Sequence, residues 1–219
     1  MLKKLRHLWS KHLEQSVGDA FAKDVSLAKV HNPLITLRHL DFSYGTEKII
    51  DDLNYTFKSP KTYQIQGVTG RGKTTLLKII LGILEPSAGS IQKPAGLSLS
   101  VVQQDDVFLP GLSVINQLRA VSPHRLQDLN LILKKCGLDD PQALPSMLSG
   151  GMKRQLALAR ALAVPSHGLI LDEAFTGMDP GLKQKLITLI KEETKDKLLI
   201  FVSHEAEALE DSFSQTKSV

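Results

Sequence analysis

The sequence predicts an α/β fold built on a largely parallel sheet, and three observations support this prediction. Strand-like runs come first in the chain, and later strand-like runs alternate with helical stretches. A glycine-rich phosphate-binding pattern lies between one such strand and one such helix. The chain has 219 residues, 42% of them hydrophobic, which is enough for one domain or two small ones with a sizeable core. This composition excludes collagen-like, disordered and disulfide-rich classes.

Residues 1–33 are predicted to form an amphipathic helical extension that ends at the hinge His31-Asn32-Pro33. Apolar residues recur there at helical spacing, namely Leu2, Leu5, Leu8, Trp9, Leu13, Val17 and Phe21. Basic residues crowd its start, namely Lys3, Lys4, Arg6, His7, Lys11 and His12. Two interpretations stay open: a helix that packs on the domain, or a docking element for a membrane surface or partner subunit.

The remaining elements follow in order along the chain. Strands are predicted at 34–42, 49–57, 62–66, 97–103, 168–171 and 198–202. Helices are predicted at 74–84, 114–120, 125–136, 150–163 and 181–194. The early strands suit an antiparallel sheet, and the later alternation of strand and helix suits a parallel one.

Charge and hydropathy narrow the function classes. The 27 basic and 23 acidic residues leave a net charge of +4, which only weakly favours an anionic partner. The apolar runs at 76–84 and 156–164 are short and interrupted by Lys78 and Arg160, so neither approaches the ~18 residues of a membrane helix. Cys136 is the single cysteine, which excludes an intramolecular disulfide and makes cytosolic chemistry the default.

The pattern G-x-x-x-x-G-K-[ST] predicts a nucleotide site. It is formed by Gly67, Val68, Thr69, Gly70, Arg71, Gly72, Lys73 and Thr74, with Thr75 next in the helix. Glycines let backbone N–H groups turn toward an anion, and the helix that follows points its positive end at the same place. We expect Lys73 to reach the β- and γ-phosphates and the Thr74 hydroxyl to help hold Mg²⁺.

A second motif supplies acids at the end of a strand. The run 168–171 is followed by Asp172 and Glu173. A phosphate-binding loop needs an acid at the end of a neighbouring strand to complete the metal shell, so we expect Asp172 to hold Mg²⁺ through water. Glu173 is placed to polarise the attacking water as a general base.

With Leu148-Ser149-Gly150-Gly151 added, the chain resembles the ATP-binding-cassette (ABC) ATPases, which have a P-loop NTPase core. The resemblance covers about residues 34–210 and involves seven motifs in the order that the family uses. It implies that Tyr44 stacks on adenine. It also implies that Gln104 contacts Mg²⁺ and couples the site to a transport partner, the acidic residue that follows favouring Gln104 over Gln103.

The same resemblance assigns the remaining site residues. Ser149, Gly150 and Gly151 match the signature motif, a second anion-binding helix start that completes the ATP site of another protomer. The segment Gly177-Met178-Asp179 matches the loop that crosses between two sites. His204 matches the histidine that touches the γ-phosphate.

The family implies an architecture and partners. We expect an ABC ATPase domain at 34–219, with a largely parallel core sheet, an antiparallel β subdomain and a compact helical subdomain at about 105–163. The substrate is ATP with Mg²⁺, and the protein pairs head to tail with a second copy of itself or with a homologous ATPase subunit. The membrane-spanning permease is on another chain, which places this subunit in the cytoplasm on the inner face of the membrane. No nucleic acid partner is expected.

Two departures from the family pattern bear on the kind of transporter. Met152 stands where glutamine is commoner in the signature, and Ala174 replaces the usual proline after Glu173. The methionine is similar to ATPases of the nitrate, sulfonate and taurine importers, and a lipid-handling transporter ATPase can share it. The substrate and the direction of transport stay open.

Three other function classes fit the sequence less well. The 75 residues between Lys73 and Ser149 leave no room for the coiled coil of DNA-repair relatives, and ribosome-acting relatives usually carry two cassettes in one chain. Asp172, Glu173 and His204 disfavour a regulatory module that binds ATP without hydrolysing it, whereas Ala174 leaves a regulatory module with slow turnover open as an alternative. Only 15 residues follow His204, so we expect a pared-down cassette whose missing sheet edge is replaced by the N-terminal helix.

Overall fold

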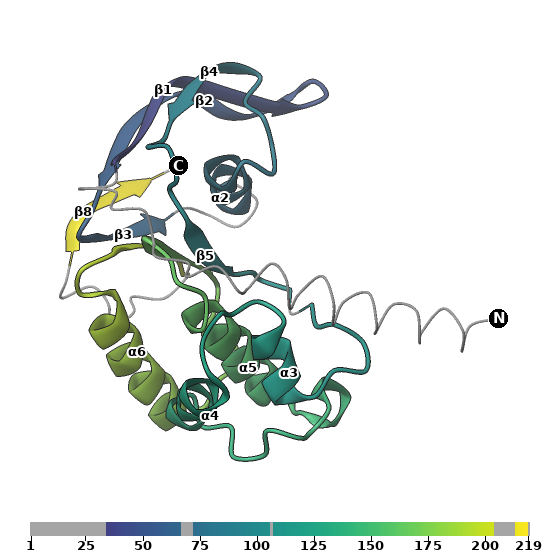
Figure 1. Cartoon of the computed structure of the whole chain (residues 1–219). Helices are drawn as coiled ribbons and strands as arrows, with labels where there is room; N and C mark the ends of the chain where they lie inside the picture. The colour runs from purple at the N-terminus through teal and green to yellow at the C-terminus, as the bar shows by residue number, and fades with distance from the viewer. Residues whose placement is uncertain (1–33, 67–71, 106, 204–212, 219) are drawn as a thin grey trace.

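The computed structural model describes residues 34–66, 72–105, 107–203 and 213–218 (Figure 1). The predicted N-terminal helix at 1–33, residues 67–71 of the phosphate-binding loop and His204 lie outside the described residues. Within the described part, two sheets and two groups of helices are arranged around two hydrophobic clusters.

The first sheet is antiparallel and has the strand order β2-β1-β4. It consists of β1 (Leu34–Tyr44), β2 (Glu47–Lys58) and β4 (Ala88–Gln92). The inward side chains of β1 are Ile35, Leu37, Leu40 and Phe42, and all are buried. Strand β4 was not predicted, because its sequence Ala-Gly-Ser-Ile-Gln is mostly exposed and lacks an apolar alternation.

The second sheet is parallel and has the strand order β5-β6-β7-β3-β8. It consists of β5 (Leu99–Val102), β6 (Gly168–Asp172), β7 (Leu198–Val202), β3 (Lys61–Gln66) and β8 (Phe213–Ser218). All residues of β6 and β7 are buried, as expected for a parallel sheet that is covered on both faces.

Alternate residues of the parallel strands belong to different hydrophobic clusters. Ile170 and Ile200 join the cluster formed with the antiparallel sheet and α2 (Lys73–Leu81). Leu171 and Phe201 join the cluster on the opposite face, formed with the other helices. Because successive side chains of a strand point to opposite faces, one sheet serves both clusters.

The helices that form the cluster with Leu171 and Phe201 lie together, away from α2 (Figure 1). They are α3 (Val114–Arg119), α4 (Leu126–Lys135), α5 (Gly150–Leu162) and α6 (Pro180–Thr194), and the short 3-10 helix η1 (Pro145–Met147) precedes α5. Among the described residues, no helix has both the length and the apolar character that crossing a membrane requires.

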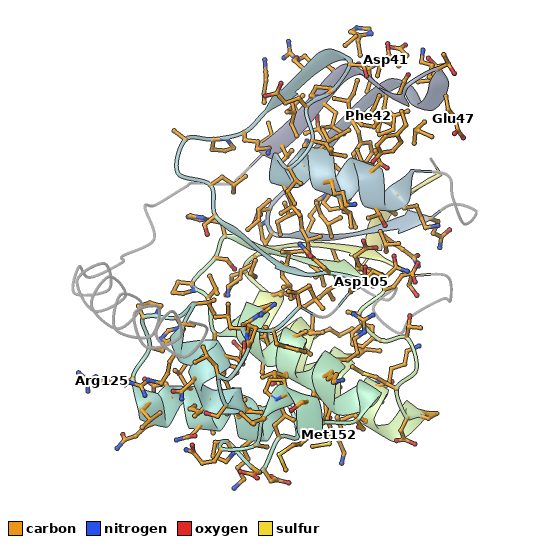
Figure 2. The ribbon with its side chains drawn as sticks, turned by 90° about the vertical axis from the view of Figure 1, so that its right-hand side faces the viewer. Asp41, Phe42, Glu47, Asp105, Arg125 and Met152 are labelled. Atoms are coloured by element: carbon orange, nitrogen blue, oxygen red, sulfur yellow. The ribbon has the colours of Figure 1, made fainter. Side chains whose placement is uncertain are left out.

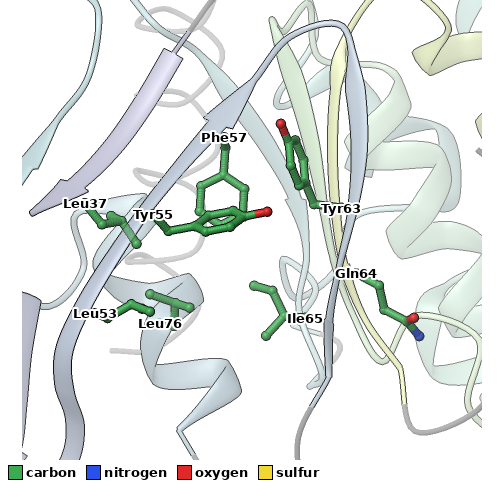
Figure 3. Close-up of a pocket in the computed structure, with 8 residues that line it drawn as sticks. All are labelled: Leu37, Leu53, Tyr55, Phe57, Tyr63, Gln64, Ile65 and Leu76. Carbon is green, nitrogen blue, oxygen red and sulfur yellow. The ribbon is translucent and has the colours of Figure 1, made fainter. Parts of the chain in front are cut away.

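Aromatic side chains fill the junction between the two sheets. Figure 3 shows Tyr55 and Phe57 of β2 close to Tyr63 of β3. The rings of Phe57 and Tyr63 meet edge to face with centroids 5.1 Å apart, and the Tyr63 hydroxyl accepts a hydrogen bond of 2.9 Å from the Lys58 backbone N–H. The cavity that these side chains line measures about 10 Å³, which is room for one water molecule and for no larger ligand.

Most predicted elements are present, and the differences have local causes. Helix α2 ends at Leu81 rather than at residue 84, because Gly82 takes the left-handed conformation with φ of 77° and its N–H bonds the Ile79 carbonyl. The sheet edge beside β3, predicted to be missing, is occupied by β8, whose residue Thr216 pairs with Gln64. The polar sequence of β8 carries no strand signal of its own.

Candidate functional site

Gly72 caps the start of α2 and is required there for two reasons. Its φ of 87° lies in the left-handed region, which strains residues that carry a side chain. A Cβ at this position would also lie 2.5 Å from Cγ2 of Ile49. The antiparallel sheet therefore packs directly against the last glycine of the phosphate-binding motif.

The next three residues begin α2. Lys73 and Thr75 are buried and Thr74 is half-buried. No acidic residue lies in the first turn, so the positive end of the helix dipole is not offset by a carboxylate. The start of α2 therefore favours an anionic group, as the motif predicts.

Asp172 ends β6 and contacts the phosphate-binding motif. The Thr74 hydroxyl donates a hydrogen bond of 2.9 Å to its Oδ2, which joins residues far apart in sequence. The Asp172 side chain is only 4% exposed, and its Oδ1 is buried with no hydrogen-bond partner among the described residues. Burial raises the pKa of Asp172, the Thr74 bond opposes this shift, and the charge of Glu173 adds to it.

The unpaired oxygen fits a magnesium ion. Mg²⁺ prefers hard oxygen ligands and is usually held by one or two protein groups together with substrate phosphates and water. Asp172 Oδ1 and the Thr74 hydroxyl are oxygen donors of this kind, adjacent to each other at the start of a helix that favours phosphate.

Glu173 has an unusual backbone conformation that sets its position. Its φ is 50°, in the left-handed region that residues with side chains rarely adopt. Its backbone N–H donates a hydrogen bond of 3.1 Å to the Val202 carbonyl at the end of β7. Ala174 and Phe175, which follow, are buried in the hydrophobic cluster that the parallel sheet forms with α3 to α6. Strain of this kind is typical of functional sites, where the surrounding packing maintains it.

The predicted signature residues begin α5. Ser149 is its N-cap and accepts a hydrogen bond of 3.3 Å from the Met152 backbone N–H. A Cβ on Gly150 or Gly151 would meet nothing within 4 Å, and Met152 is 37% exposed. This helix start therefore presents an open surface to an external group.

Gln104 lies just beyond the end of β5 and is exposed, as are Gln103 and Asp105. The Arg154 guanidinium donates hydrogen bonds to the backbone carbonyls of both glutamines. Sequence reasoning did not single out Arg154. Its signal was weak: it is one of several basic residues on α5, and only the fold brings it to the glutamines.

The structure brings some predicted residues together and separates others. Thr74 and Asp172 are in contact, and Lys73 is close enough for its charge to lower the pKa of Asp172. Figure 2 shows Met152, at the start of α5, at the far end of the molecule from α2. Tyr44, at the end of β1, is 51% exposed and contacts Phe42 edge to face, which leaves ring surface free for stacking.

Comparison with known proteins identifies the family. The ABC transporter family model matches residues 50–176, which is more than half of the chain. This chain belongs to the ABC transporter family. The matched segment includes Lys73, the signature residues and Glu173.

The sequences of curated relatives align with most of the length of this ABC ATPase. It is 36% identical over 199 residues to the intermembrane phospholipid transport system ATP-binding protein MlaF of Haemophilus influenzae, covering 80% of this chain and 75% of that protein. It is 30% identical over 190 residues to the taurine import ATP-binding protein TauB of Escherichia coli O157:H7, covering 80% and 74%. The predicted resemblance to ABC transporter ATPases, the taurine group among them, is confirmed.

A solved structure confirms the fold. The ATP-binding subunit of an ABC transporter superposes with a TM-score of 0.77 at 21% identity, covering 85% of each chain. The predicted P-loop NTPase α/β fold is therefore correct. The protein is the ATP-hydrolysing subunit of an ABC transporter, as predicted.

Proposed function

We propose that this subunit hydrolyses Mg²⁺-bound ATP at the site where the start of α2 meets the ends of β6 and β7. The observation that carries the proposal is the buried, unpaired Oδ1 of Asp172, on a carboxylate whose other oxygen accepts the hydrogen bond from Thr74. A buried carboxylate oxygen without a partner costs free energy unless a ligand satisfies it.

Each residue of the proposed site is given the role that its motif predicts. Gly67–Thr75 and the start of α2 hold the phosphates, with Lys73 at the β- and γ-phosphates. Thr74, Asp172 and Gln104 hold Mg²⁺, which when bound neutralises charge on the phosphate oxygens. Glu173 orients the attacking water and accepts its proton, and His204 supports the γ-phosphate. Tyr44 stacks on the adenine.

A second protomer completes the site. The start of α5 has an N-terminal dipole and two unobstructed glycines, but it lies far from α2 in the same chain (Figure 2). In the proposed head-to-tail pair, Ser149, Gly150 and Gly151 of one subunit face the ATP held by the other. The partner is a second copy of this chain or a homologous ATPase subunit, and bound ATP holds the two together.

Transport requires a permease on another chain. The proposed surface for it is near Gln104, between a helical subdomain at about 105–163 and the rest of an ATPase domain at 34–219. The extension at 1–33 is assigned no part in hydrolysis. The subunit then works on the cytoplasmic side of the membrane, attached to its inner face through the permease.

Glu173→Gln tests the assignment most directly. The amide keeps the size of the side chain but cannot accept the proton, so we expect turnover to fall about a thousandfold while ATP still binds. Phosphate release gives the rate, and sedimentation with Mg²⁺-ATP should show pairs that persist. Turnover equal to that of the unaltered protein would contradict the role of Glu173.

A matched variant tests whether the loss of one negative charge anywhere in the protein is enough to lower turnover. Glu192→Gln makes the same chemical change at an exposed position on α6 and should leave turnover unchanged.

Lys73→Ala should weaken ATP binding itself, measured with a fluorescent nucleotide. Unaltered ATP affinity in that variant would contradict the phosphate-binding assignment.

A further inference from the structure

The described residues of the segment that links β5 to α3, namely 103–105 and 107–113, are here called the glutamine loop and are held by helices. Beyond Val102 the ladder of the parallel sheet stops, because β5 ends there. The last residue pair between β5 and β6 is Val102 with Leu171, so the loop beyond it is not part of the sheet. Three side chains from α3 and α5 hold it instead, namely Gln117, Arg154 and Arg160.

Arg154 makes the contact nearest to Gln104. Its Nη1 donates a hydrogen bond of 2.7 Å to the Gln103 carbonyl, and its Nη2 donates to the Gln104 carbonyl. The planar guanidinium presents parallel N–H groups, so one side chain can hold two successive carbonyls in a defined orientation. Hydrogen bonds from a charged donor are stronger than those between neutral groups. The backbone of Gln104 is therefore held against α5 by hydrogen bonds from Arg154.

The other two contacts hold the rest of the loop to the same group of helices. Arg160 donates a hydrogen bond of 2.7 Å to the Val107 carbonyl and lies 5.4 Å from the centre of the Phe108 ring. Gln117, fully buried on α3, accepts from the Leu109 N–H and donates to the Leu109 carbonyl. These contacts join the glutamine loop to α3 and α5, and its connection to the sheet is at the end of β5.

We propose that Arg154 is a positioning residue that makes Gln104 and the signature end of α5 move as one unit. The inference rests on the proposed role of Gln104 at Mg²⁺. Ser149 and Arg154 lie on the same helix, so engagement of Ser149 by the ATP of a partner sets where the Gln104 backbone lies. Arg154 thereby links completion of the paired site to placement of the metal contact.

Arg154→Met tests this role through the dependence of turnover on Mg²⁺. Methionine keeps the apolar stem but has no donor, so Gln104 loses its attachment. We expect the Mg²⁺ concentration for half-maximal ATP hydrolysis to rise about tenfold. ATP affinity measured in EDTA should stay unchanged, since the carbonyls of Gln103 and Gln104 that Arg154 holds lie outside the phosphate-binding motif. Arg154→Lys keeps the charge and can bond one carbonyl, so it should give an intermediate value.

The control is Arg119→Met, which removes the same group from an exposed position on α3. Within the part of the chain that the structure describes, Arg119 donates only to the Asn116 side chain on its own helix, so the Mg²⁺ dependence should stay that of the unaltered protein. A purely structural role for Arg154 would lower the melting temperature without moving the Mg²⁺ dependence, and that result overturns the proposal. Should Arg154→Met fail to fold, Arg154→Lys supplies the same comparison.

A double variant separates this inference from the proposed function. If Arg154 acts through Gln104, Arg154→Met combined with Gln104→Ala will be no worse than Gln104→Ala alone. Effects that multiply would show that Arg154 acts elsewhere and would overturn the inference while leaving ATP hydrolysis by this site intact. Absence of hydrolysis in the unaltered protein would instead contradict the proposed function itself.

Discussion

Asp172 has two carboxylate oxygens in different surroundings. Oδ2 accepts the Thr74 hydrogen bond, and Oδ1 is buried without a partner among the described residues. The charged form of a buried carboxylate is penalised, which raises its pKa. An adjacent cation favours the charged form and removes that penalty. The same residue therefore destabilises the nucleotide-free protein and favours a metal-bound state.

This environment predicts a pH-dependent effect of Asp172→Asn on stability. Because the pKa of Asp172 is raised on folding, its contribution to stability is present below the unfolded-state pKa and is lost as pH rises through the folded-state pKa. The amide does not ionise, so at pH 7 the variant should melt at a higher temperature than the unaltered protein without Mg²⁺ or nucleotide. Turnover should fall on the order of a hundredfold or more.

Thermal denaturation across pH gives the measurement. The gain in melting temperature should shrink as pH is lowered toward the ordinary pKa of aspartate, about 3.9. Added Mg²⁺-ATP should raise the melting temperature of the unaltered protein and not that of the variant. A gain that does not vary with pH would mean that ionisation of Asp172 is not its cause.

Gly72→Ala should be strongly destabilising, by about 2 kcal/mol or more. The new Cβ would be placed in a left-handed backbone conformation and against Ile49. Gly150→Ala is the matched control, since its Cβ would meet nothing within 4 Å. Urea denaturation of the nucleotide-free protein compares the two variants, and equal losses in both would contradict the close contact with Ile49.

At the scale of elements, the start of α5 has a structural role as a helix cap and, in the proposed pair, a second role toward ATP. Ser149 caps the helix through the Met152 N–H, while the same N-terminal end is left open to an external phosphate. A capping side chain and a phosphate-binding side chain need different properties, because aspartate caps a helix well but repels phosphate. Substitutions at position 149 can therefore separate the two roles.

Ser149→Asp should keep α5 stable and reduce hydrolysis, whereas Ser149→Ala should cost about 1 kcal/mol of stability. In the aspartate variant the carboxylate would accept the Met152 N–H bond but would face the ATP of the partner subunit. Urea denaturation gives the stability, and phosphate release gives the rate. If both variants hydrolyse ATP at the unaltered rate, the start of α5 is a helix cap and nothing more.

At the scale of the whole molecule, β8 joins the last described residues to β3, which lies early in the chain. It pairs in parallel with β3, which otherwise has β7 on one side only. Unpaired strand edges invite association with other chains. Since β3 leads directly into the phosphate-binding loop, the pairing also supports the site.

Deletion of residues 213–219 should therefore expose the edge of β3. We expect a lower melting temperature and self-association on heating, because Tyr63 and Ile65 belong to a strand that is buried on both faces. Deletion of Val219 alone is the control and should have neither effect. Light scattering during thermal denaturation gives both readouts, and an unchanged melting temperature would show that β8 adds nothing to the fold.

Much of the site was predictable because its residues follow strand ends. Asp172 follows the predicted strand 168–171, and Thr74 begins the helix that comes after the predicted strand 62–66. The carboxyl ends of parallel strands meet at one edge of the sheet. No sequence pattern predicts the left-handed conformation of Glu173, because it is maintained by a hydrogen bond to Val202, a residue far away in the sequence. Arg154 was missed since its partners are backbone carbonyls, which every residue has.

The sequence by itself determined the family, the order of elements and the motif residues, because these depend on local spacing and on residue chemistry. The tertiary structure decided which elements pair. Strands β4 and β8 become strands only because β1 and β3 offer them backbone partners. It also decided that Gln104 is fastened to α5 by Arg154, since hydrogen bonds between segments far apart in sequence form only after the chain has folded.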